Sequence, residues 1–193
     1  MAEESSRTRG DRSSVVVLLG GGLDSSVVLQ LVWRRSSRVI CLHYDYGQPA
    51  LEGERRAIAR ICRGYRIKPY WRVLPQNFVK NGDEYECRNA LFVLAAAAEF
   101  GDRPLQIMLG AHAGSSYYDC TPRFLESMQS LLDGYFDGRV ILEAPLIRFR
   151  KSDIVAYGRR AGVPLSLTYS CTRRGDRPCG SCPSCLDRRA LNV

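Results

Sequence analysis

The sequence has no hydrophobic run long enough to span a bilayer, and its first residues lack the apolar stretch of a secretory signal peptide. We therefore expect a cytoplasmic protein without a membrane partner, and we expect the polar residues 1–13 to form a disordered tail. No internal repeat occurs, which excludes repeat architectures. Of the 193 residues, 45% are hydrophobic and 25% are charged, as in an ordinary globular domain with a substantial core.

Apolar runs of strand length alternate along the chain with segments of helical periodicity. We expect strands at 15–19, 38–44, 68–74, 104–112 and 139–146, and helices at 24–33, 51–65, 88–100, 121–136 and 151–162. Residues 75–85 are rich in turn formers and are expected to form a loop. The alternation predicts an α/β fold with a doubly wound, mainly parallel sheet. We divide the chain into a domain at 14–165 and a C-terminal segment at 166–193.

Glycine and polar residues follow four of the five predicted strands, at 20–26, 43–48, 110–120 and 145–151. In a doubly wound sheet the ligand lies at the carboxyl ends of the strands, near the point where the strand order reverses. We therefore expect the functional site along this edge of the sheet.

Three consecutive glycines, in the segment GGGLDSS at 20–26, separate the first strand from the first helix. A strand, a glycine loop and a helix N-terminus present backbone N–H groups to an anion, and we expect a serine or aspartate to cap the helix. The segment lacks the Walker lysine and the third glycine of the dinucleotide fingerprint. Ser25 and Ser26 can donate to phosphate oxygens, and Asp24 can hold Mg²⁺. The alternative is a glycine-rich connection without a ligand.

Four of the eight cysteines crowd near the C-terminus, at Cys171, Cys179, Cys182 and Cys185. Four thiolates at the spacing C-x7-C-x2-C-x2-C form a closed tetrahedral shell, which suits a structural Zn²⁺. Without a secretory signal, such a cluster favours a metal site over a disulfide framework. An iron–sulfur cluster, disulfides and idle thiols are the alternatives.

The formal net charge is +8, and much of the positive charge lies in the last quarter of the chain. A basic surface suits phosphate-bearing ligands, either nucleotides or nucleic acid. It can also be a solvated face that only favours solubility. The charge alone does not establish a nucleic-acid partner, and we do not expect one.

The loop GGGLDSS resembles the SGGxDS loop of the ATP pyrophosphatases, or PP-loop enzymes, which wraps the phosphates of ATP while a carboxylate or another molecule is adenylated. Further segments resemble one PP-loop family in particular, 7-cyano-7-deazaguanine synthase of the queuosine pathway. They are DYGQ at 45–48, RN at 88–89, YYDC at 117–120, EAPL at 143–146, Lys151 and the tail CGSCPSC. Their order and spacing match almost from end to end of the chain.

The resemblance implies an ATP-dependent carbon–nitrogen ligase with an adenine-nucleotide alpha-hydrolase-like fold. That family adenylates 7-carboxy-7-deazaguanine and, with ammonia, converts it through the amide to 7-cyano-7-deazaguanine, using ATP with Mg²⁺ and a structural Zn²⁺. The ATP-binding residues would be Leu19, Gly20, Gly21, Gly22, Leu23, Asp24, Ser25 and Ser26. Asp24, Arg88 and Lys151 would be catalytic, and the acid would be bound by Tyr46, Gln48, Arg88, Asn89, Tyr117 and Asp119.

Several of these roles have structural alternatives. Arg88 and Lys151 would neutralise the phosphates or the developing oxyanion, or they would form surface salt bridges. Asp119 would accept two N–H groups of a guanine-like base, or it would cap the helix that follows it. Tyr46 and Gln48 would contact the acid or only shape their loop.

Most departures from the family pattern lie on the substrate side. The segment before Arg88 is short, and the family run Ser-Gly-Tyr-Pro-Asp-Cys is SSYYDC at 115–120, whereas the ATP loop differs only in Gly20, which replaces a serine. ATP use is therefore better supported than nitrile formation. One alternative is a relative that joins the activated acid to another amine, such as that of a protein, and stops at the amide. Another is a zinc-knuckle nucleic-acid-binding module with a vestigial ATP loop. The sequence also leaves open whether the protein forms a homodimer.

Overall fold

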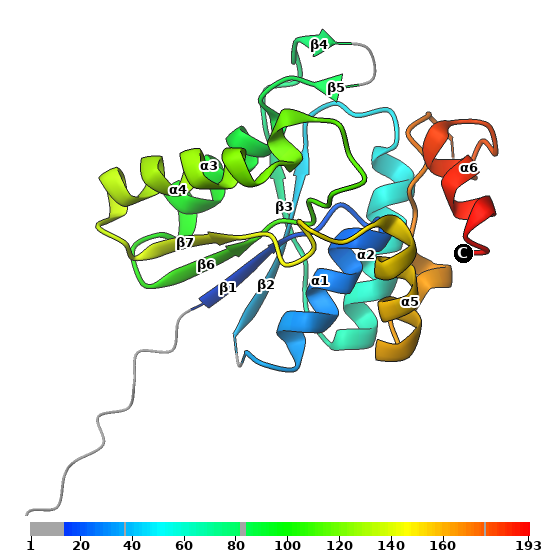
Figure 1. Cartoon of the computed structure of the whole chain (residues 1–193), viewed down its shortest axis with the longest axis horizontal. Coiled ribbons are helices and arrows are strands. Elements are labelled where there is room, and N and C mark those ends of the chain that lie inside the picture. The colour runs from blue at the N-terminus through cyan, green and yellow to red at the C-terminus, as the bar shows by residue number, and fades with distance from the viewer. Residues whose placement is uncertain (1–13, 37, 82–83, 176) are drawn as a thin grey trace, which may run out of the picture.

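The computed structural model describes residues 14–36, 38–81, 84–175 and 177–193, so the tail expected at 1–13 lies outside the described residues. Five parallel strands form one sheet in the order β3-β2-β1-β6-β7 (Figure 1). Their bounds are β1 Ser14–Leu18, β2 Val39–Asp45, β3 Tyr70–Val73, β6 Leu105–Met108 and β7 Val140–Glu143. The central strand β1 pairs with β2 on one side and with β6 on the other. The strand order therefore reverses at β1, where an open parallel sheet binds its ligand.

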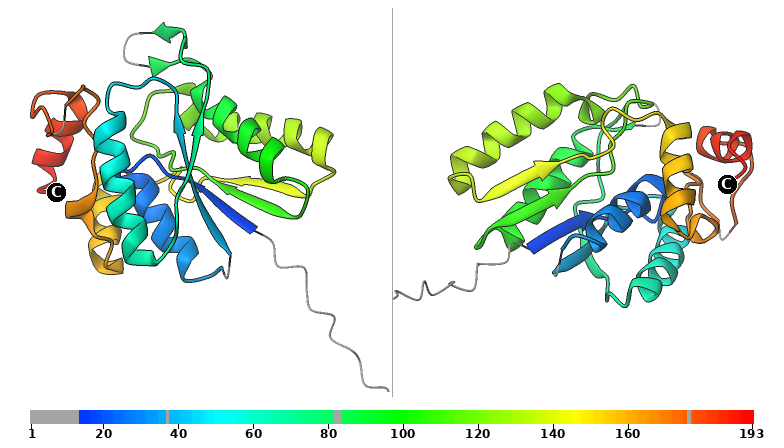
Figure 2. Two further views of the ribbon diagram at one scale, coloured as in Figure 1. Left: turned by 180° about the vertical axis from the view of Figure 1, so that it is seen from behind. Right: turned by 60° about the horizontal axis from the view of Figure 1, so that its bottom comes forward.

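Helices cover both faces of this sheet (Figures 1 and 2). On one face lie α1 (Leu23–Trp33), α2 (Leu51–Tyr65) and α5 (Lys151–Ala161), and on the other lie α3 (Arg88–Phe100) and α4 (Pro122–Phe136). Side chains of β1 alternate between the two layers, because Val15 and Val17 pack in the first core and Val16 and Leu18 in the second. The predicted doubly wound parallel sheet is confirmed.

Local sequence signals, such as periodicity and capping residues, account for most of the helix boundaries. The helices predicted at 51–65 and 88–100 have the bounds of α2 and α3. Thr121 caps α4, since its hydroxyl accepts the N–H of Phe124 at 3.2 Å. Gly162 ends α5 with a left-handed φ of +74°.

The loop predicted at 75–85 contains a short antiparallel pair, β4 (Lys80–Asn81) with β5 (Glu84–Tyr85). Aromatic contacts hold this pair against the sheet layer, because the Tyr85 ring lies 5.1 Å from that of Tyr46, measured between centroids. The prediction of a loop missed this pair, since two-residue strands leave no periodicity to detect.

The C-terminal segment returns to the edge of the sheet that carries the site. It ends with α6 (Pro183–Ala190), which the sequence pattern did not predict. Short 3-10 turns lie before α4, at Tyr118–Cys120, and after α5, at Leu165–Leu167. The Tyr169 N–H donates to the Gly21 carbonyl at 2.9 Å, which joins this segment to the glycine loop. Among the described residues, no helix combines the length and the apolarity needed to cross a membrane.

Candidate active site

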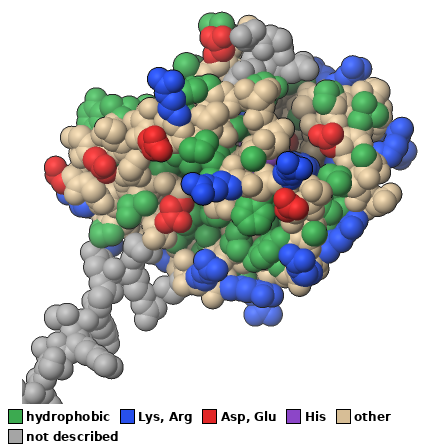
Figure 3. All heavy atoms as spheres, viewed as in Figure 1, with side chains coloured by type: hydrophobic (Ala, Val, Ile, Leu, Met, Phe, Trp, Pro, Cys, Tyr) green, Lys and Arg blue, Asp and Glu red, His purple; other side chains and the backbone are tan. Residues whose placement is uncertain are grey.

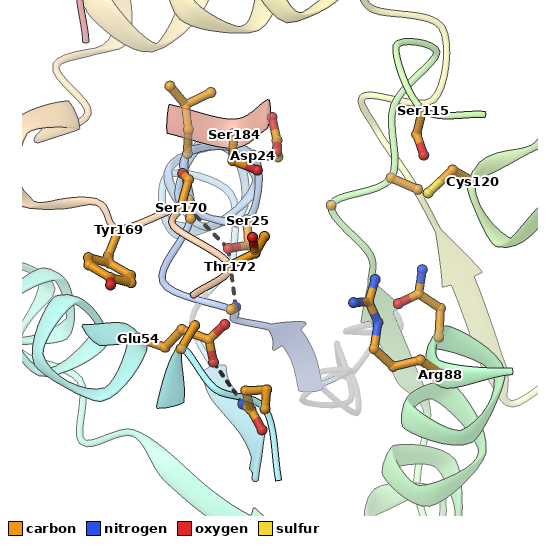
Figure 4. Close-up of a pocket in the computed structure, with 18 of the residues that line it drawn as sticks. Asp24, Ser25, Glu54, Arg88, Ser115, Cys120, Tyr169, Ser170, Thr172 and Ser184 are labelled. Atoms are coloured by element: carbon orange, nitrogen blue, oxygen red, sulfur yellow. Dashed lines mark hydrogen bonds between the residues drawn. The ribbon is translucent and has the colours of Figure 1, made fainter. Parts of the chain in front are cut away.

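A cavity of about 770 Å³ opens at the carboxyl ends of β1, β2 and β6 (Figure 4). Its walls come from the loops after these strands, from the start of α3 and α5, and from the C-terminal segment. Segments from both ends of the chain therefore meet in one site. On the face shown in Figure 3, Lys and Arg side chains are scattered, with Asp and Glu side chains among them.

The glycine loop presents the N-terminus of α1 to this cavity. Gly22 is the N-cap residue of α1, and no side chain in the described chain caps this helix. The predicted serine or aspartate cap was wrong, because Ser25 and Ser26 lie within the first turn and donate to the Gly22 carbonyl at 3.4 and 2.7 Å. Gly21 has a φ of +74°, and a Cβ there would come within 3.0 Å of the Glu54 carbonyl oxygen. The uncapped N–H groups suit an anion.

Asp24 and Lys151 form an ion pair beside the loop. Lys151 Nζ donates to Asp24 Oδ2 at 2.5 Å, and His112 Nε2 lies 3.8 Å from the same oxygen. Asp24 Oδ1 is buried and has no hydrogen-bond partner within the described residues. A free, buried carboxylate oxygen fits a hard cation such as Mg²⁺.

Arg88 and Tyr46 lie on the opposite side of the cavity. Arg88 is half-buried, and its Nε has no hydrogen-bond partner within the described chain. Although burial lowers the pKa of Arg88, its interactions with Tyr46 and Asp119 outweigh that effect, so its pKa is raised and the guanidinium stays charged. The Tyr46 ring packs against Phe92, 5.3 Å away between centroids. A free cation next to aromatic rings suits a flat anionic ligand.

Asp119 is buried behind this wall. Its Oδ2 accepts the N–H of Asn89, in the first turn of α3, at 3.4 Å. The helix that follows Asp119 is capped by Thr121, so the alternative role of Asp119 as the cap of that helix was wrong. Asp119 instead supports the start of the helix that carries Arg88.

Gln48 connects the loop after β2 to an acidic residue that sequence analysis missed. The Gln48 amide donates to Glu54 Oε2 at 2.7 Å and to the Tyr44 carbonyl at 3.1 Å, and its oxygen accepts the Tyr46 N–H at 2.9 Å. Burial raises the pKa of Glu54 to about 7, although Gln48 and Arg88 oppose the shift. The sequence signal that could have found Glu54 is its helical spacing. Glu54 lies on the face of α2 that buries Ala57, Ile58 and Ile61.

The four C-terminal cysteines come together at the rim of the cavity. Their sulfur atoms all lie within 4.8 Å of one another. Tetrahedral Zn–S bonds of about 2.3 Å place sulfur atoms about 3.8 Å apart, so the cluster fits such an ion. Backbone N–H groups point at the sulfurs, with Cys182 N 3.3 Å from Cys179 Sγ and Cys179 N 3.4 Å from Cys171 Sγ. The structure thus supports a metal site at the predicted residues.

Most of the predicted ligand-binding residues line the cavity. They are Leu19, Gly20, Gly22, Leu23, Asp24, Ser25, Tyr46, Gln48, Arg88, Asn89, Tyr117 and Lys151. Gly21, Ser26 and Asp119 are not among the lining residues. Their direct contacts with a ligand stay predictions.

The fold and the glycine loop define the class, an α/β protein of the PP-loop type. The NMN synthetase from Francisella tularensis superposes with a TM-score of 0.55 at 16% identity, over 94% of this chain and 78% of that one. The U34-tRNA thiolase from Methanococcus maripaludis, solved with its [4Fe-4S] cluster, gives a TM-score of 0.51 at 16% identity, over 97% and 66%. At these identities the likeness concerns the fold alone.

Sequence comparison then gives the family. The family described as "Queuosine biosynthesis protein QueC" matches residues 14–84 and 72–191. The 7-cyano-7-deazaguanine synthases of Methanoculleus marisnigri and Synechococcus sp. are 30% and 31% identical to this chain; they align with 90% and 92% of it, and with 91% and 93% of their own lengths. The chain belongs to the QueC family. This confirms the predicted family and the predicted type of enzyme, an ATP-dependent ligase of the 7-cyano-7-deazaguanine synthase type.

Proposed function

We propose that this chain adenylates the carboxylate of 7-carboxy-7-deazaguanine and transfers the acyl group to ammonia, which leads through the amide to 7-cyano-7-deazaguanine. The QueC family supports a place in queuosine biosynthesis. The observation that carries the proposal is one cavity in which Asp24, at the glycine loop, lies opposite Arg88 (Figure 4). Lys151 pairs with Asp24, and Tyr46 interacts with Arg88. Such a cavity has one end for phosphates and one for a flat acid.

The glycine loop would hold the phosphates of ATP. The free N–H groups at the start of α1 would bind phosphate oxygens, and Lys151 would neutralise charge on the leaving pyrophosphate. Asp24 Oδ1, the unpartnered oxygen, would hold Mg²⁺ together with the ATP phosphates. Bound Mg²⁺ stabilises the negative charge that develops when pyrophosphate leaves.

The acid would lie at the opposite end of the cavity. Arg88 would face the carboxylate, and the ring of Tyr46 would stack on or border the flat heterocycle, with Asn89 and Tyr117 beside it. Holding the carboxylate against the α-phosphate accelerates their reaction mainly by orientation.

A structural Zn²⁺ would be held by Cys171, Cys179, Cys182 and Cys185. Four thiolates leave no open coordination position, so the ion would support the fold rather than the chemistry. It would fix residues 166–193 as the segment that closes the cavity over the glycine loop.

Mass spectrometry of the products tests this function. The purified chain is incubated with 7-carboxy-7-deazaguanine, ATP-Mg and ammonia, and pyrophosphate is measured in parallel. A nitrile product supports the proposal in full, and an amide alone supports the divergent relative that uses the same activation. If an amide forms only when another amine is added, the acceptor is not ammonia. Absence of acid-dependent pyrophosphate release overturns the proposal and favours a binding module.

A further inference from the structure

Glu54 lies where the two ends of the cavity meet. It belongs to the first turn of α2, and Figure 4 shows its side chain below the glycine loop and opposite Arg88. Its backbone carbonyl oxygen lies close to the loop, since a Cβ on Gly21 would come to 3.0 Å from it. If ATP and the acid bind as proposed, the reacting carbonyl carbon lies between these two ends. Glu54 then lies beside the reacting carbon.

The carboxylate of Glu54 has one oxygen fixed and one free. Gln48 donates to Oε2 at 2.7 Å, and His43 Nε2 lies 3.6 Å from the same atom. No hydrogen bond from the described residues reaches Oε1. Gln48 is itself fixed by the backbone of Tyr44 and Tyr46, so the carboxylate is oriented before any ligand binds.

His43, His112 and Lys151, which also line the cavity, are already engaged by other groups of the protein. His43 Nδ1 lies 3.0 Å from the Leu19 carbonyl and must donate to it, and burial lowers the pKa of His43 to about 4. His112 Nδ1 accepts the N–H of Gly114 at 3.0 Å, which leaves its other nitrogen as a donor toward Asp24. Lys151 is paired with Asp24. The remaining lone pair of His43, on Nε2, faces the Gln48 amide nitrogen at 3.5 Å and Glu54 Oε2 at 3.6 Å.

The surroundings of Glu54 allow its charge to change near neutral pH. The groups that face it are His43 and Asp45 from β2, Tyr46 from the following loop, and Arg88 from α3. Burial is the largest influence and raises the pKa of Glu54 to about 7. A base is most effective when its pKa lies near the working pH.

We propose that Glu54 is the general base of the acyl-transfer step, an assignment that rests on the function proposed above. The amine nitrogen attacks the carbonyl carbon of the acyl adenylate, and a carbon–nitrogen bond forms. One N–H proton moves to Glu54 Oε1, the bond between the carbonyl carbon and the AMP oxygen breaks, and AMP leaves with the electron pair. Gln48 acts as a positioning residue, because it fixes the orientation of the carboxylate.

The test separates activation of the acid from transfer to the amine. Glu54→Gln keeps the size and the hydrogen-bond acceptor toward Gln48 but cannot take up the proton. Acid-dependent exchange of pyrophosphate into ATP reports adenylation, and amide formation at a fixed concentration of unprotonated ammonia reports transfer. The matched control is Glu52→Gln on the same helix, where the side chain is 71% exposed. Thermal melting checks the fold, and Glu54→Asp is a second variant.

The expected result is selective. Glu54→Gln keeps pyrophosphate exchange within about threefold, and its amide formation falls by about 10²–10⁴-fold. In the wild type the transfer rate rises with pH up to about 7, as the base loses its proton, and this rise is absent in Glu54→Gln. Glu54→Asp keeps the rise at a lower rate. Hydroxylamine, which is a stronger nucleophile, reduces the deficit of Glu54→Gln by about tenfold or more.

Two results overturn the base role alone. One is wild-type transfer by Glu54→Gln with the pH rise intact, and the other is equal loss of exchange and transfer in a folded variant. If the wild type itself exchanges no pyrophosphate with this acid, the proposed function fails first and the base role fails with it.

Discussion

At the scale of single residues, Asp24 is distinguished by having one oxygen held by a cation and the other left free in a buried place. We expect Asp24→Asn to lower acid-dependent pyrophosphate exchange by about two to four orders of magnitude, because it removes a charge that stabilises the leaving pyrophosphate through Mg²⁺. Raising the Mg²⁺ concentration should restore part of the rate. The control is Asp102→Asn, since Asp102 is 76% exposed and pairs with Arg103 at the surface. A wild-type exchange rate in Asp24→Asn removes the metal role.

Glu54 also links the site to the stability of the fold. Its pKa is raised from 4.5 to about 7 by burial, so the folded state binds the proton more tightly than the unfolded chain does. The stability it contributes is complete below about pH 4.5 and is lost as the pH rises through 7, an amount of about 3 kcal/mol. Glu54→Gln has no such loss.

We therefore expect Glu54→Gln to be more stable than the wild type at about pH 8, by about 2–3 kcal/mol, and nearly equal to it at about pH 4.5. The difference between the two proteins in urea unfolding at each pH gives this value, because the other titrating groups, including the cysteines, cancel. A stability difference that does not change with pH contradicts the raised pKa. A catalytic group that costs stability is expected where activity needs a strained or poorly solvated side chain.

At the scale of elements, α2 and the C-terminal segment pack closely at Gly53, because this residue has no side chain. A Cβ on Gly53 would lie 2.3 Å from ring carbons of Tyr169, whose N–H donates to the Gly21 carbonyl. Gly53→Ala must therefore push the ring away and disturb the segment that leads to Cys171. We expect a loss of about 1–3 kcal/mol in stability and weaker ATP binding, measured by urea unfolding and by calorimetry.

Gly64 in the same helix supplies the matched control for Gly53. Nothing lies within 4 Å of a Cβ on Gly64, so Gly64→Ala should stabilise α2 by about 0.5–1 kcal/mol and leave ATP affinity unchanged. Equal effects of the two substitutions would show that Tyr169 does not depend on the space at Gly53.

In the four-cysteine segment, Cys179 is exposed, while Cys171, Cys182 and Cys185 are buried and belong to the core on the side of α1 and α2. If Zn²⁺ joins them, its binding free energy is part of the folding free energy. We expect about one zinc per chain by elemental analysis, and loss of zinc with a lower melting temperature in Cys182→Ser. Cys87→Ser, at an exposed cysteine outside the cluster, should keep the metal. Iron with sulfide in place of zinc would favour the iron–sulfur alternative.

At the scale of the whole molecule, the features that sequence analysis predicted are those that short segments encode. The strand β1 is a run of buried valines, the bounds of α2 and α3 follow from their periodicity, and the four cysteines lie within one short stretch of chain. Thr121 before Pro122 is a local cap signal. The parallel sheet covered on both faces then followed from the rules for alternating strands and helices, whereas the strand order came from the structure.

The features that sequence analysis missed depend on contacts between distant segments. The Asn89 N–H, at the start of α3, donates to Asp119. The residues around Glu54 are Gln48, His43 and Arg88, which come from outside α2. The contact of Tyr169 with Gly21 joins the two ends of the chain. Neither composition nor periodicity records such contacts, because they arise only when the elements pack together.

The contact between Tyr169 and Gly21 also predicts a coupling between the two sites. The C-terminal segment lines the cavity through Cys171 and Cys182, so a ligand held by the glycine loop should stabilise the segment that holds the metal. Ligand binding to the folded state raises its stability, and such coupling is reciprocal between two sites.

We therefore expect ATP to raise the affinity for zinc, measured by equilibrium competition with a colorimetric chelator, and zinc removal to weaken ATP binding by the same factor, about 5-fold or more. Adenosine is the control ligand, because it lacks the phosphates that the glycine loop would hold and should leave the zinc affinity unchanged. Gly53→Ala should reduce the effect of ATP, since it displaces Tyr169 without touching a cysteine. The zinc affinity with ATP, with adenosine and with neither ligand measures the coupling directly. Equal affinities in all three conditions would mean that the segment and the loop bind their ligands independently, despite the hydrogen bond between them.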